Sequence, residues 1–370
     1  MQSVKSIINL DALIHNIGVI KSKLNGSKIV AVVKANAYGH GLVQIAKTLS
    51  SHVEAYAVAR IEEALSLRSA GIVKPIILLE GFFNEADIPV IVANNFEVAL
   101  HSFQLLEQVE RAEIPSPVKC WLKLDTGMHR LGVGPDEADE FYNRMMSCGN
   151  IAKPFGLISH LCTADEPEKS DYTERQIRIF RDFEHAHPGM HTALANSAGI
   201  FSWPESHTDW VRPGIILYGV SPYEDRTGKD LGLRPVMTLT SNLIAVRRLR
   251  KGEKVGYGIS YEAERDTTLG IVAMGYGDGY PRQTPNGTPV WINGRFAYTA
   301  GHVCMDMMFV DLGPDSEDCV GDEVELWGEH LPVEIIAGKV GTIPYELVLK
   351  LTSRVEFVYR GGNSDGGAFC

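Results

Sequence analysis

The stretch KIVAVVKANAYGHGLVQIAKTLSS, residues 28–51, joins a short apolar run to a longer amphipathic one. Residues 28–34 are rich in valine and isoleucine, which is typical of a buried strand. Residues 41–51 place apolar side chains at helical spacing. Between them stands Lys34, at the end of an apolar run, where a buried charge is costly. Either its stem is buried while the amine reaches water, or the amine has a chemical role.

The same strand-then-helix unit recurs through the first two-thirds of the chain. Helical patterns such as residues 60–71, 101–112 and 169–187 lie between most of the strand-like runs. Further runs rich in branched and aromatic residues are AYAVA, PIILLE, FEVAL, VKCWLKL, GLISH, HTALA and DWVRP. Strand and helix repeated eight times predict an α/β fold, a (β/α)8 TIM-like barrel. A doubly wound parallel sheet is the alternative.

Near residue 230 the pattern changes to alternating apolar and polar residues, most clearly in MTLTSNLIAVRRL, residues 237–249. Such alternation with turn signals between the runs is typical of antiparallel strands. LGIVAMGYGDGYP, residues 269–281, is interpreted in the same way, and two helical stretches precede a last strand, RVEFVYR. We therefore predict a barrel domain over residues 1–230 and a mostly antiparallel β domain over residues 231–370.

Composition and charge exclude several classes of protein. The 370-residue chain has a formal net charge of -11 and no basic tract, which counts against nucleic-acid binding. The N-terminus has no long apolar segment and no stretch reaches membrane-spanning length, so we expect a cytoplasmic protein without a membrane partner. The six cysteines form no C-x-x-C pair, and no metal-ligand motif is present. Reduced thiols and no metal site are the prediction.

Polar residues fall where the predicted barrel strands end. Lys34 follows the first strand, Lys123 closes the fifth, His160 follows the sixth, Ser197 follows the seventh and Arg212 lies at the eighth. In such barrels chemistry gathers at the carboxyl ends of the strands, and phosphate is held after strands seven and eight. Together these residues predict an active site at that end.

A phosphate site is predicted from the Ser197 hydroxyl and the backbone amides of Gly214 and Ile215. These amides are expected to be free N–H groups at the start of a helical segment, which can bind an anion. The alternative is that Ser197 only caps the following helix. A phosphate site and a strand-end lysine such as Lys34 together indicate pyridoxal 5′-phosphate (PLP), whose aldehyde forms a Schiff base with lysine.

Nine segments resemble, in the same order, the signature segments of the alanine racemase family. They are VVKANAYGHG, LDTGMHRLG, SHLCTADE, NSAG, VRPGIILYG, GYGISY, GYGDGYPR, CMDMM and TIPYEL, and they span nearly the whole chain. The resemblance implies a PLP-binding barrel, a C-terminal β domain and a homodimer with active sites shared between subunits. It implies interconversion of L-alanine and D-alanine, which supplies D-alanine for peptidoglycan precursors, and leaves open a catabolic role instead.

The resemblance also implies roles for individual residues. Lys34 matches the lysine that binds PLP and serves as the base for the D-enantiomer. Tyr257, from the partner subunit, matches the base for the L-enantiomer. His160 is expected between Tyr257 and Arg212, and Arg212 is expected to face the pyridine nitrogen of the cofactor.

Further matches concern the cofactor, the substrate and the entrance. Arg130 is expected at the cofactor's phenolic oxygen and near the substrate carboxylate, oriented by Lys123 if that lysine is carbamylated. Met305 of the partner is expected near the substrate carboxylate. His302 stands where the family often has arginine, and we place it in the access corridor. The family's phosphate ligands match Tyr38, Ser197, Gly214, Ile215 and Tyr345, and Tyr276 and Tyr345 line the entrance.

Three other functions remain open at this stage. A racemase of broader amino-acid specificity would use the same scaffold, although the bulk of Tyr276 and Tyr345 argues against it. A non-catalytic PLP-holding protein would need neither Tyr257 nor an entrance. A PLP decarboxylase of related barrel type fits Lys34 but not the segments around Tyr257 and Met305.

Overall fold

Eight short parallel strands form a closed barrel, which confirms the predicted fold and rules out the doubly wound sheet. The computed structural model describes residues 4–362. Each strand pairs with the next, and the last closes the ring against the first where Lys28 faces Trp210. The barrel strands are β2 (Lys28–Val32), β3 (Ala55–Val58), β4 (Ile76–Leu78), β5 (Glu97–Leu100), β6 (Lys119–Lys123), β7 (Gly156–Ile158), β8 (His191–Ala193) and β9 (Trp210–Val211).

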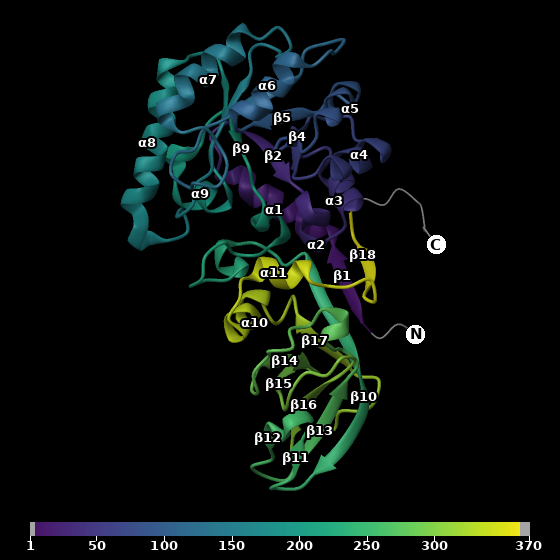
Figure 1. Ribbon diagram of the computed structural model, residues 1–370. Coiled ribbons are helices and arrows are strands. Elements are labelled where there is room, and N and C mark those ends of the chain that lie inside the picture. Colours follow the sequence, from purple (N-terminus) through teal and green to yellow (C-terminus); the bar gives the residue numbers. More distant parts are fainter. Residues whose placement is uncertain (1–3, 363–370) are drawn as a thin grey trace. The chain divides into compact units, whose positions relative to one another are not determined.

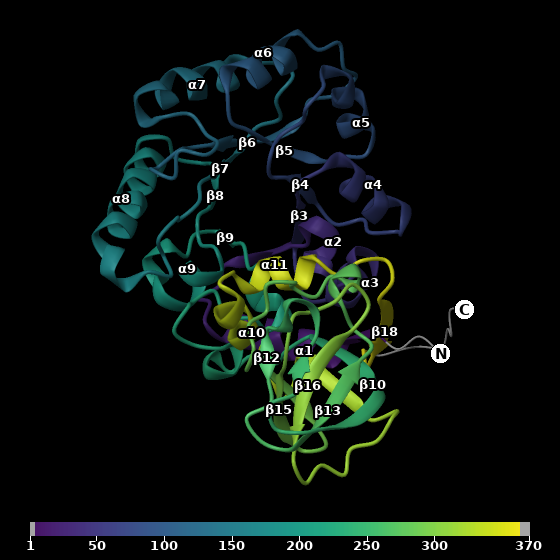
Figure 2. The same ribbon diagram turned by 60° about the horizontal axis from the view of Figure 1, so that its bottom comes forward.

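Helices surround the ring of strands on its outer side (Figure 2). Every residue of β3, β4 and β7 is buried, because a parallel sheet enclosed by helices has no solvent-facing side. This is why the strands read as continuous apolar runs rather than as alternating ones. The surrounding helices are α3 (Leu42–Leu49), α4 (Ile61–Ser69), α5 (Ile88–Ala93), α6 (Phe103–Arg111), α7 (Pro135–Ser147), α8 (Ser170–Ala186) and α9 (Ser197–Ser202), with 3-10 turns η1 (Glu85–Asp87), η2 (Pro167–Lys169), η3 (Pro204–Ser206) and η4 (Ile215–Tyr218).

The described chain divides into two compact units that are not contiguous in sequence. The barrel unit comprises residues 17–37 and 41–217. The second unit, here called the C-terminal unit, comprises residues 4–16, 38–40 and 218–362. β1 (Lys5–Asn9) belongs to the second unit, and α1 (Leu10–Ser22) contains the first boundary. The domain limit set at residue 230 from the sequence stays a prediction.

The C-terminal unit is built on an eight-stranded sheet (Figure 1). Its strand order is β13-β16-β15-β14-β17-β10-β1-β18, and all pairs are antiparallel except β1 with β18. The mostly antiparallel β domain is therefore confirmed. Its elements are η5 (Gly228–Leu231), β10 (Met237–Leu249), β11 (Lys254–Val255), η6 (Tyr257–Ile259), β12 (Tyr261–Glu262), β13 (Thr267–Val272), η7 (Tyr276–Asp278), β14 (Pro289–Ile292), β15 (Arg295–Thr299), β16 (Met308–Gly313), β17 (Glu323–Trp327), α10 (Val333–Val340), α11 (Pro344–Leu349) and β18 (Glu356–Arg360).

Of the β-structure predicted over residues 269–281, only the first four residues lie in a strand. β13 ends at Val272, and the chain then turns through η7. The Gly275 N–H donates to Asp278 Oδ2 at 2.9 Å, and Gly279 has a φ of 106°. A left-handed backbone is cheap only for glycine, so the glycines that interrupt the apolar run produce a turn.

The chain makes a left-handed turn immediately after Lys34, in the element labelled α2 (Lys34–Gly39). Ala35, Asn36, Ala37 and Tyr38 have φ values of 52°, 55°, 53° and 51°. A left-handed helical residue that is not glycine costs about 1–2 kcal/mol. Four in succession are found only where surrounding structure enforces them, which is a feature of functional sites.

No helix among residues 4–362 is long and apolar enough to cross a membrane. The five cysteines in this part of the chain are free thiols, in agreement with the prediction of reduced cysteines. Cys370, the sixth, lies outside the described residues.

Candidate active site

The barrel brings the predicted site residues to the carboxyl ends of its strands. Lys34 stands two residues beyond β2, and Lys123 is the last residue of β6. His160 follows β7, and Arg212 follows β9. Because the strands of a closed parallel barrel all end on one face, residues far apart in sequence meet there.

Four cationic side chains act on one another at this end of the barrel. Burial, and then the charges of Arg212, Arg130 and Lys34, lower the pKa of Lys123 from its ordinary value to about 7. The Lys123 side chain is 8% exposed, Lys34 is half-buried and Arg130 is exposed. Positive charges gathered in an acidic protein form a site that favours an anionic ligand.

His160 lies in the same positive field. Burial, and then the charges of Arg212 and Lys123, hold the pKa of His160 well below its usual range. The imidazole is therefore neutral at pH 7, with one nitrogen that donates and one that accepts.

The Arg212 guanidinium is fixed by three backbone carbonyls at the ends of two strands, β7 and β8. Nη1 donates to Ala193 O at 2.6 Å, and Nη2 donates to Leu194 O at 3.2 Å and to Ser159 O. Burial lowers the pKa of Arg212 to about 9, so the group is still a cation at neutral pH. Only 5% of this residue is exposed, and its orientation is set before any ligand binds.

A buried network of polar side chains holds the backbone at His160 and at Ser159, whose carbonyl binds Arg212. The sequence did not predict this network. Gln176, on α8, donates from Nε2 to His160 O at 3.0 Å and to Thr126 Oγ1 at 3.2 Å. Thr126 Oγ1 lies 2.9 Å from Ser159 Oγ, and Ser159 O accepts from Arg212. Gln176 is completely buried within an otherwise amphipathic helix. A polar residue on the apolar face of that helix was the available signal.

Ser197 and Gly214 lie together at the ends of the last two strands. The Gly214 N–H donates to Ser197 Oγ at 3.0 Å, and both residues are buried. Asn196, and not Ser197, caps α9, because its Oδ1 accepts from Gly199 N at 2.9 Å. The Ser197 hydroxyl therefore has no capping role and keeps its own hydrogen available to donate to an anion.

Two of the predicted phosphate ligands lie together in the C-terminal unit. The ring centroids of Tyr38 and Tyr345 are 6.0 Å apart, and that of Tyr218 lies 5.0 Å from Tyr38. Burial raises the pKa of Tyr38 to about 12. Tyr38 therefore keeps its proton at every physiological pH and can act as a hydrogen-bond donor.

Tyr257 lies on η6, the turn that joins β11 to β12, and is 74% exposed. The turn is anchored where β12 begins. Tyr261 Oη donates to Asp311 Oδ2 at 2.9 Å, and Asn286 Nδ2 donates to Ser260 O at 2.7 Å. An exposed phenol on an anchored turn can be presented to another molecule at a fixed position.

The structure brings three more predicted residues to neighbouring loops of the C-terminal unit. A Cβ on Gly258 would come within 3.7 Å of the His302 ring, which places His302 beside the Tyr257 turn. The Tyr276 N–H donates to Cys304 O at 3.0 Å, next to Met305. Met305 and Tyr276 are 53% and 38% exposed.

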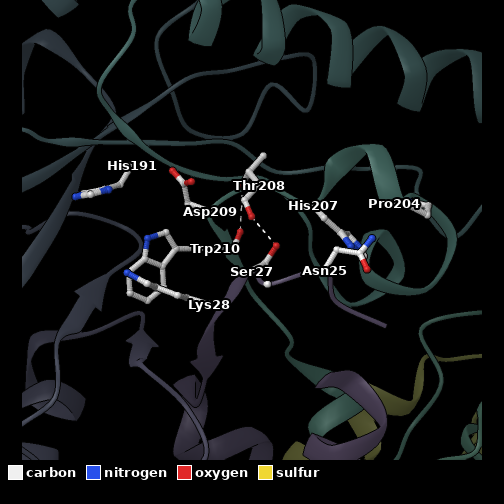
Figure 3. A pocket seen from close by; sticks show the side chains of 10 residues that line it. Asn25, Ser27, Lys28, His191, Pro204, His207, Thr208, Asp209 and Trp210 are labelled. Atoms are coloured by element: carbon white, nitrogen blue, oxygen red, sulfur yellow. Dashed lines mark hydrogen bonds between the residues drawn. The ribbon is translucent and has the colours of Figure 1, made fainter. Parts of the chain in front are cut away.

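A cavity of about 410 Å³ lies at the opposite end of the barrel strands (Figure 3). It is lined by Lys28, His191 and Trp210, which are the first residues of β2, β8 and β9. The Lys28 amine lies over the Trp210 ring, 5.1 Å from its centroid. None of the predicted site residues reaches this cavity, and among the described residues no group of His, Cys, Asp and Glu could hold a metal ion.

Comparison with known proteins covers both units. The model of the N-terminal domain of alanine racemase matches residues 8–222, and that of the C-terminal domain matches residues 236–359. The alanine racemase of Vibrio parahaemolyticus is 54% identical over 359 residues, 97% of this chain and 99% of that protein. The biosynthetic alanine racemase of Escherichia coli is 55% identical over 360 residues, with the same coverage of 97% and 99%.

Solved structures give the same result. The biosynthetic alanine racemase from Pseudomonas aeruginosa superposes with a TM-score of 0.93 at 39% identity, over 98% of this chain and 100% of that one. The enzyme from Acinetobacter baumannii superposes with a TM-score of 0.91 at 36% identity, over 97% of this chain and 100% of that one.

Proposed function

Because the chain belongs to the alanine racemase family, whose members are PLP-dependent isomerases, we propose that it interconverts L-alanine and D-alanine with two bases, Lys34 and Tyr257. The observation that supports the proposal is that Lys34 stands at a strand end, close enough to the buried Lys123 for their charges to act on each other. The Ser197 hydroxyl and the Gly214 amide, which suit a phosphate, meet at the ends of strands of the same barrel. A racemase needs one base on each face of the substrate Cα, and a single lysine cannot serve both.

The donor set fits PLP. A lysine amine can hold the aldehyde, and the Ser197 hydroxyl with the Gly214 amide can hold a phosphate. The cation cluster around Lys123 favours a ligand with several negative charges. When bound, PLP supplies the electron sink that makes the Cα proton of an amino acid acidic. Tyr38, which keeps its phenolic proton, Tyr345 and Ile215 complete the proposed phosphate contacts.

Arg212 has a separate role toward the cofactor's pyridine nitrogen. Its guanidinium is a cation held by three carbonyls, and it cannot readily give up a proton to that nitrogen. A pyridine without a proton is a weaker electron sink, which limits transamination as a side reaction. Arg130 is proposed to donate to the cofactor's phenolic oxygen and to approach the substrate carboxylate.

Each base must be deprotonated when it accepts the Cα proton of its substrate. Lys34 Nζ accepts the Cα proton of D-alanine, and Tyr257 Oη accepts that of L-alanine. We assign stabilisation of the Tyr257 phenolate to Arg212 acting through His160, whose lowered pKa keeps it neutral and able to donate one N–H to the phenolate oxygen.

Tyr257 is proposed to act in the active site of the partner subunit of a homodimer. Support comes from its 74% exposure and from two other exposed apolar residues of the same unit, Ile259 at 60%, on the same turn, and Met305 at 53%. Exposed large apolar side chains grouped on one surface mark an interface. Met305 would contact the substrate carboxylate region of the same partner site, and Tyr276 and His302 would lie at its entrance.

The activity is tested by circular dichroism of L-alanine and of D-alanine over time with added PLP. Decay of both signals to zero supports a racemase, whereas stable signals from protein that binds PLP favour a non-catalytic PLP-holding protein. A panel of serine, lysine and arginine separates alanine racemisation from a broader specificity. The bulk of Tyr276 and Tyr345 predicts that these larger substrates react poorly.

The two bases are tested by Lys34→Ala and Tyr257→Phe. The first should lose the covalent link to PLP, and the second should keep the cofactor but lose racemisation. Tyr298→Phe is the matched control, because Tyr298 is also exposed, at 51%, and lies on β15 of the same unit. Wild-type rates in Tyr257→Phe would exclude the two-base assignment.

Sharing between subunits is tested by mixing the two variants. A mixed dimer of Lys34→Ala and Tyr257→Phe subunits contains one site with both bases intact if Tyr257 acts in the partner. Activity should then return on subunit exchange. No return, with exchange verified by mass, would place both bases in one subunit.

A further inference from the structure

The left-handed turn after Lys34 needs a restraint that holds its first residue. Ala35 has a φ of 52° and is exposed, so packing does not enforce its conformation. Later residues of the turn have local hydrogen bonds. Ala37 N donates to Val33 O at 2.8 Å, and Leu42 N donates to Asn36 Oδ1 at 2.9 Å.

Glu63 supplies the restraint at Ala35. Its Oε1 accepts from the Ala35 N–H at 2.5 Å. Its Oε2 accepts from the N–H groups of Ala59 and Arg60 at 3.0 Å and 3.1 Å. An ionised carboxylate makes stronger hydrogen bonds than a neutral acceptor, so one side chain ties the chain leaving β2 to the chain leaving β3.

We propose that Glu63 is a positioning residue for Lys34, which it orients by holding Ala35 in the left-handed conformation. The peptide that carries the held N–H begins at Lys34, so its orientation sets the direction in which the Lys34 stem leaves the strand. The inference rests on the proposed function, in which Lys34 binds PLP and moves a proton. Glu63 itself touches neither reacting atom and transfers no proton.

The test compares Glu63→Gln with Glu62→Gln in the PLP-loaded enzyme. Glu62 is the adjacent exposed glutamate in the same first turn of α4, so both variants remove one charge from that helix start. We expect Glu63→Gln to lower kcat by about 10–100-fold, because a small misplacement of a reacting group has that effect. The KM for alanine should change little, and Glu62→Gln should match the wild type.

Hydrogen–deuterium exchange gives a readout that does not depend on activity. In Glu63→Gln the peptide covering residues 34–41 should exchange at least about tenfold faster, since a hydrogen bond to a charged acceptor shifts local opening by that factor. Should Glu63→Gln fail to fold, Glu63→Asp carries the same expectation. It keeps the charge at the helix start but is too short to reach Ala35.

A rescue separates orientation of Lys34 from simple capping of α4. Ala35→Gly in the Glu63→Gln background should recover about tenfold of the lost kcat, because glycine adopts a positive φ without strain. A lost helix cap would gain nothing from a change at residue 35.

Two results would overturn the proposal. One is exchange over residues 34–41 and kcat in Glu63→Gln equal to those of Glu62→Gln. The other is a loss of kcat that Ala35→Gly does not rescue, with faster exchange confined to α4. If the wild-type protein failed to racemise alanine, the exchange arm would still report on Glu63, so failure of the function and failure of the inference are distinguishable.

Discussion

Lys123→Met tests whether burial and neighbouring cations make a charge at Lys123 costly at the carboxyl ends of the barrel strands. The pKa of Lys123 falls from an ordinary 10.5 to about 7, through burial and then through Arg212, Arg130 and Lys34. At 1.36 kcal/mol for each pH unit, a protonated Lys123 costs the folded protein about 5 kcal/mol. Methionine has a similar length and no charge. The variant should therefore be several kcal/mol more stable than the wild type at pH 6.

The sign of the pH dependence follows from proton binding. Between pH 7 and 10.5 the unfolded chain keeps the Lys123 proton while the folded protein has lost it, so wild-type stability rises with pH in this window. Below pH 7 both states are protonated and the full cost is present. The difference in unfolding free energy between variant and wild type should shrink as pH rises through the window. Urea titrations at several pH values, in buffer free of CO2, measure it.

Lys119→Met is the matched control, because Lys119 begins the same strand β6 and is exposed. It should show no such pH-dependent difference. Equal slopes of unfolding free energy against pH for the wild type and Lys123→Met between pH 7 and 10 would refute the lowered pKa.

A neutral Lys123 amine near pH 7 can also combine with CO2, forming the N–C bond of a carbamate and releasing one proton. Bicarbonate should then stabilise the wild type alone, and electron density beyond Lys123 Nζ would identify the group.

Three further changes probe other parts of the structure. Gln176→Leu leaves buried partners of the network unsatisfied and should cost about 3 kcal/mol of unfolding free energy with a fall in kcat, as urea titration and kinetics would show. Gly39→Ala puts a Cβ 2.2 Å from Val348 O at a φ of 78°, so we expect the free energy of unfolding to fall by about 2–5 kcal/mol. Gly18→Ala is the control, because its Cβ would have nothing within 4 Å and should stabilise α1 slightly. Thermal unfolding compares the two variants. Tyr276→Ala should raise kcat/KM for serine relative to alanine, and an unchanged ratio would remove Tyr276 from substrate selection.

The sequence by itself determined the barrel and the places of its polar residues. The barrel strands are short runs buried along most or all of their length, and this local pattern is visible without knowing the partners of the strand. Once the strands are known, the closed ring puts Lys34, Lys123, His160 and Arg212 at one end. The resemblance to alanine racemases then supplied roles that periodicity cannot show, such as that of Tyr257, which reads locally as an ordinary turn residue.

Only the tertiary structure revealed how these residues are held and charged. Gln176 and Thr126 are 50 residues apart in the chain, and nothing local links them. Ala35 and Glu63 come together because β2 and β3 are neighbours in the ring. The left-handed turn could not be predicted from the sequence, because none of its first four residues with positive φ is glycine. The lowered pKa of Lys123 likewise depends on burial and on charges from other strands. Secondary structure can be predicted from short-range sequence patterns. Backbone strain, electrostatic fields and buried hydrogen bonds cannot, because they arise from contacts between segments that are distant in the sequence.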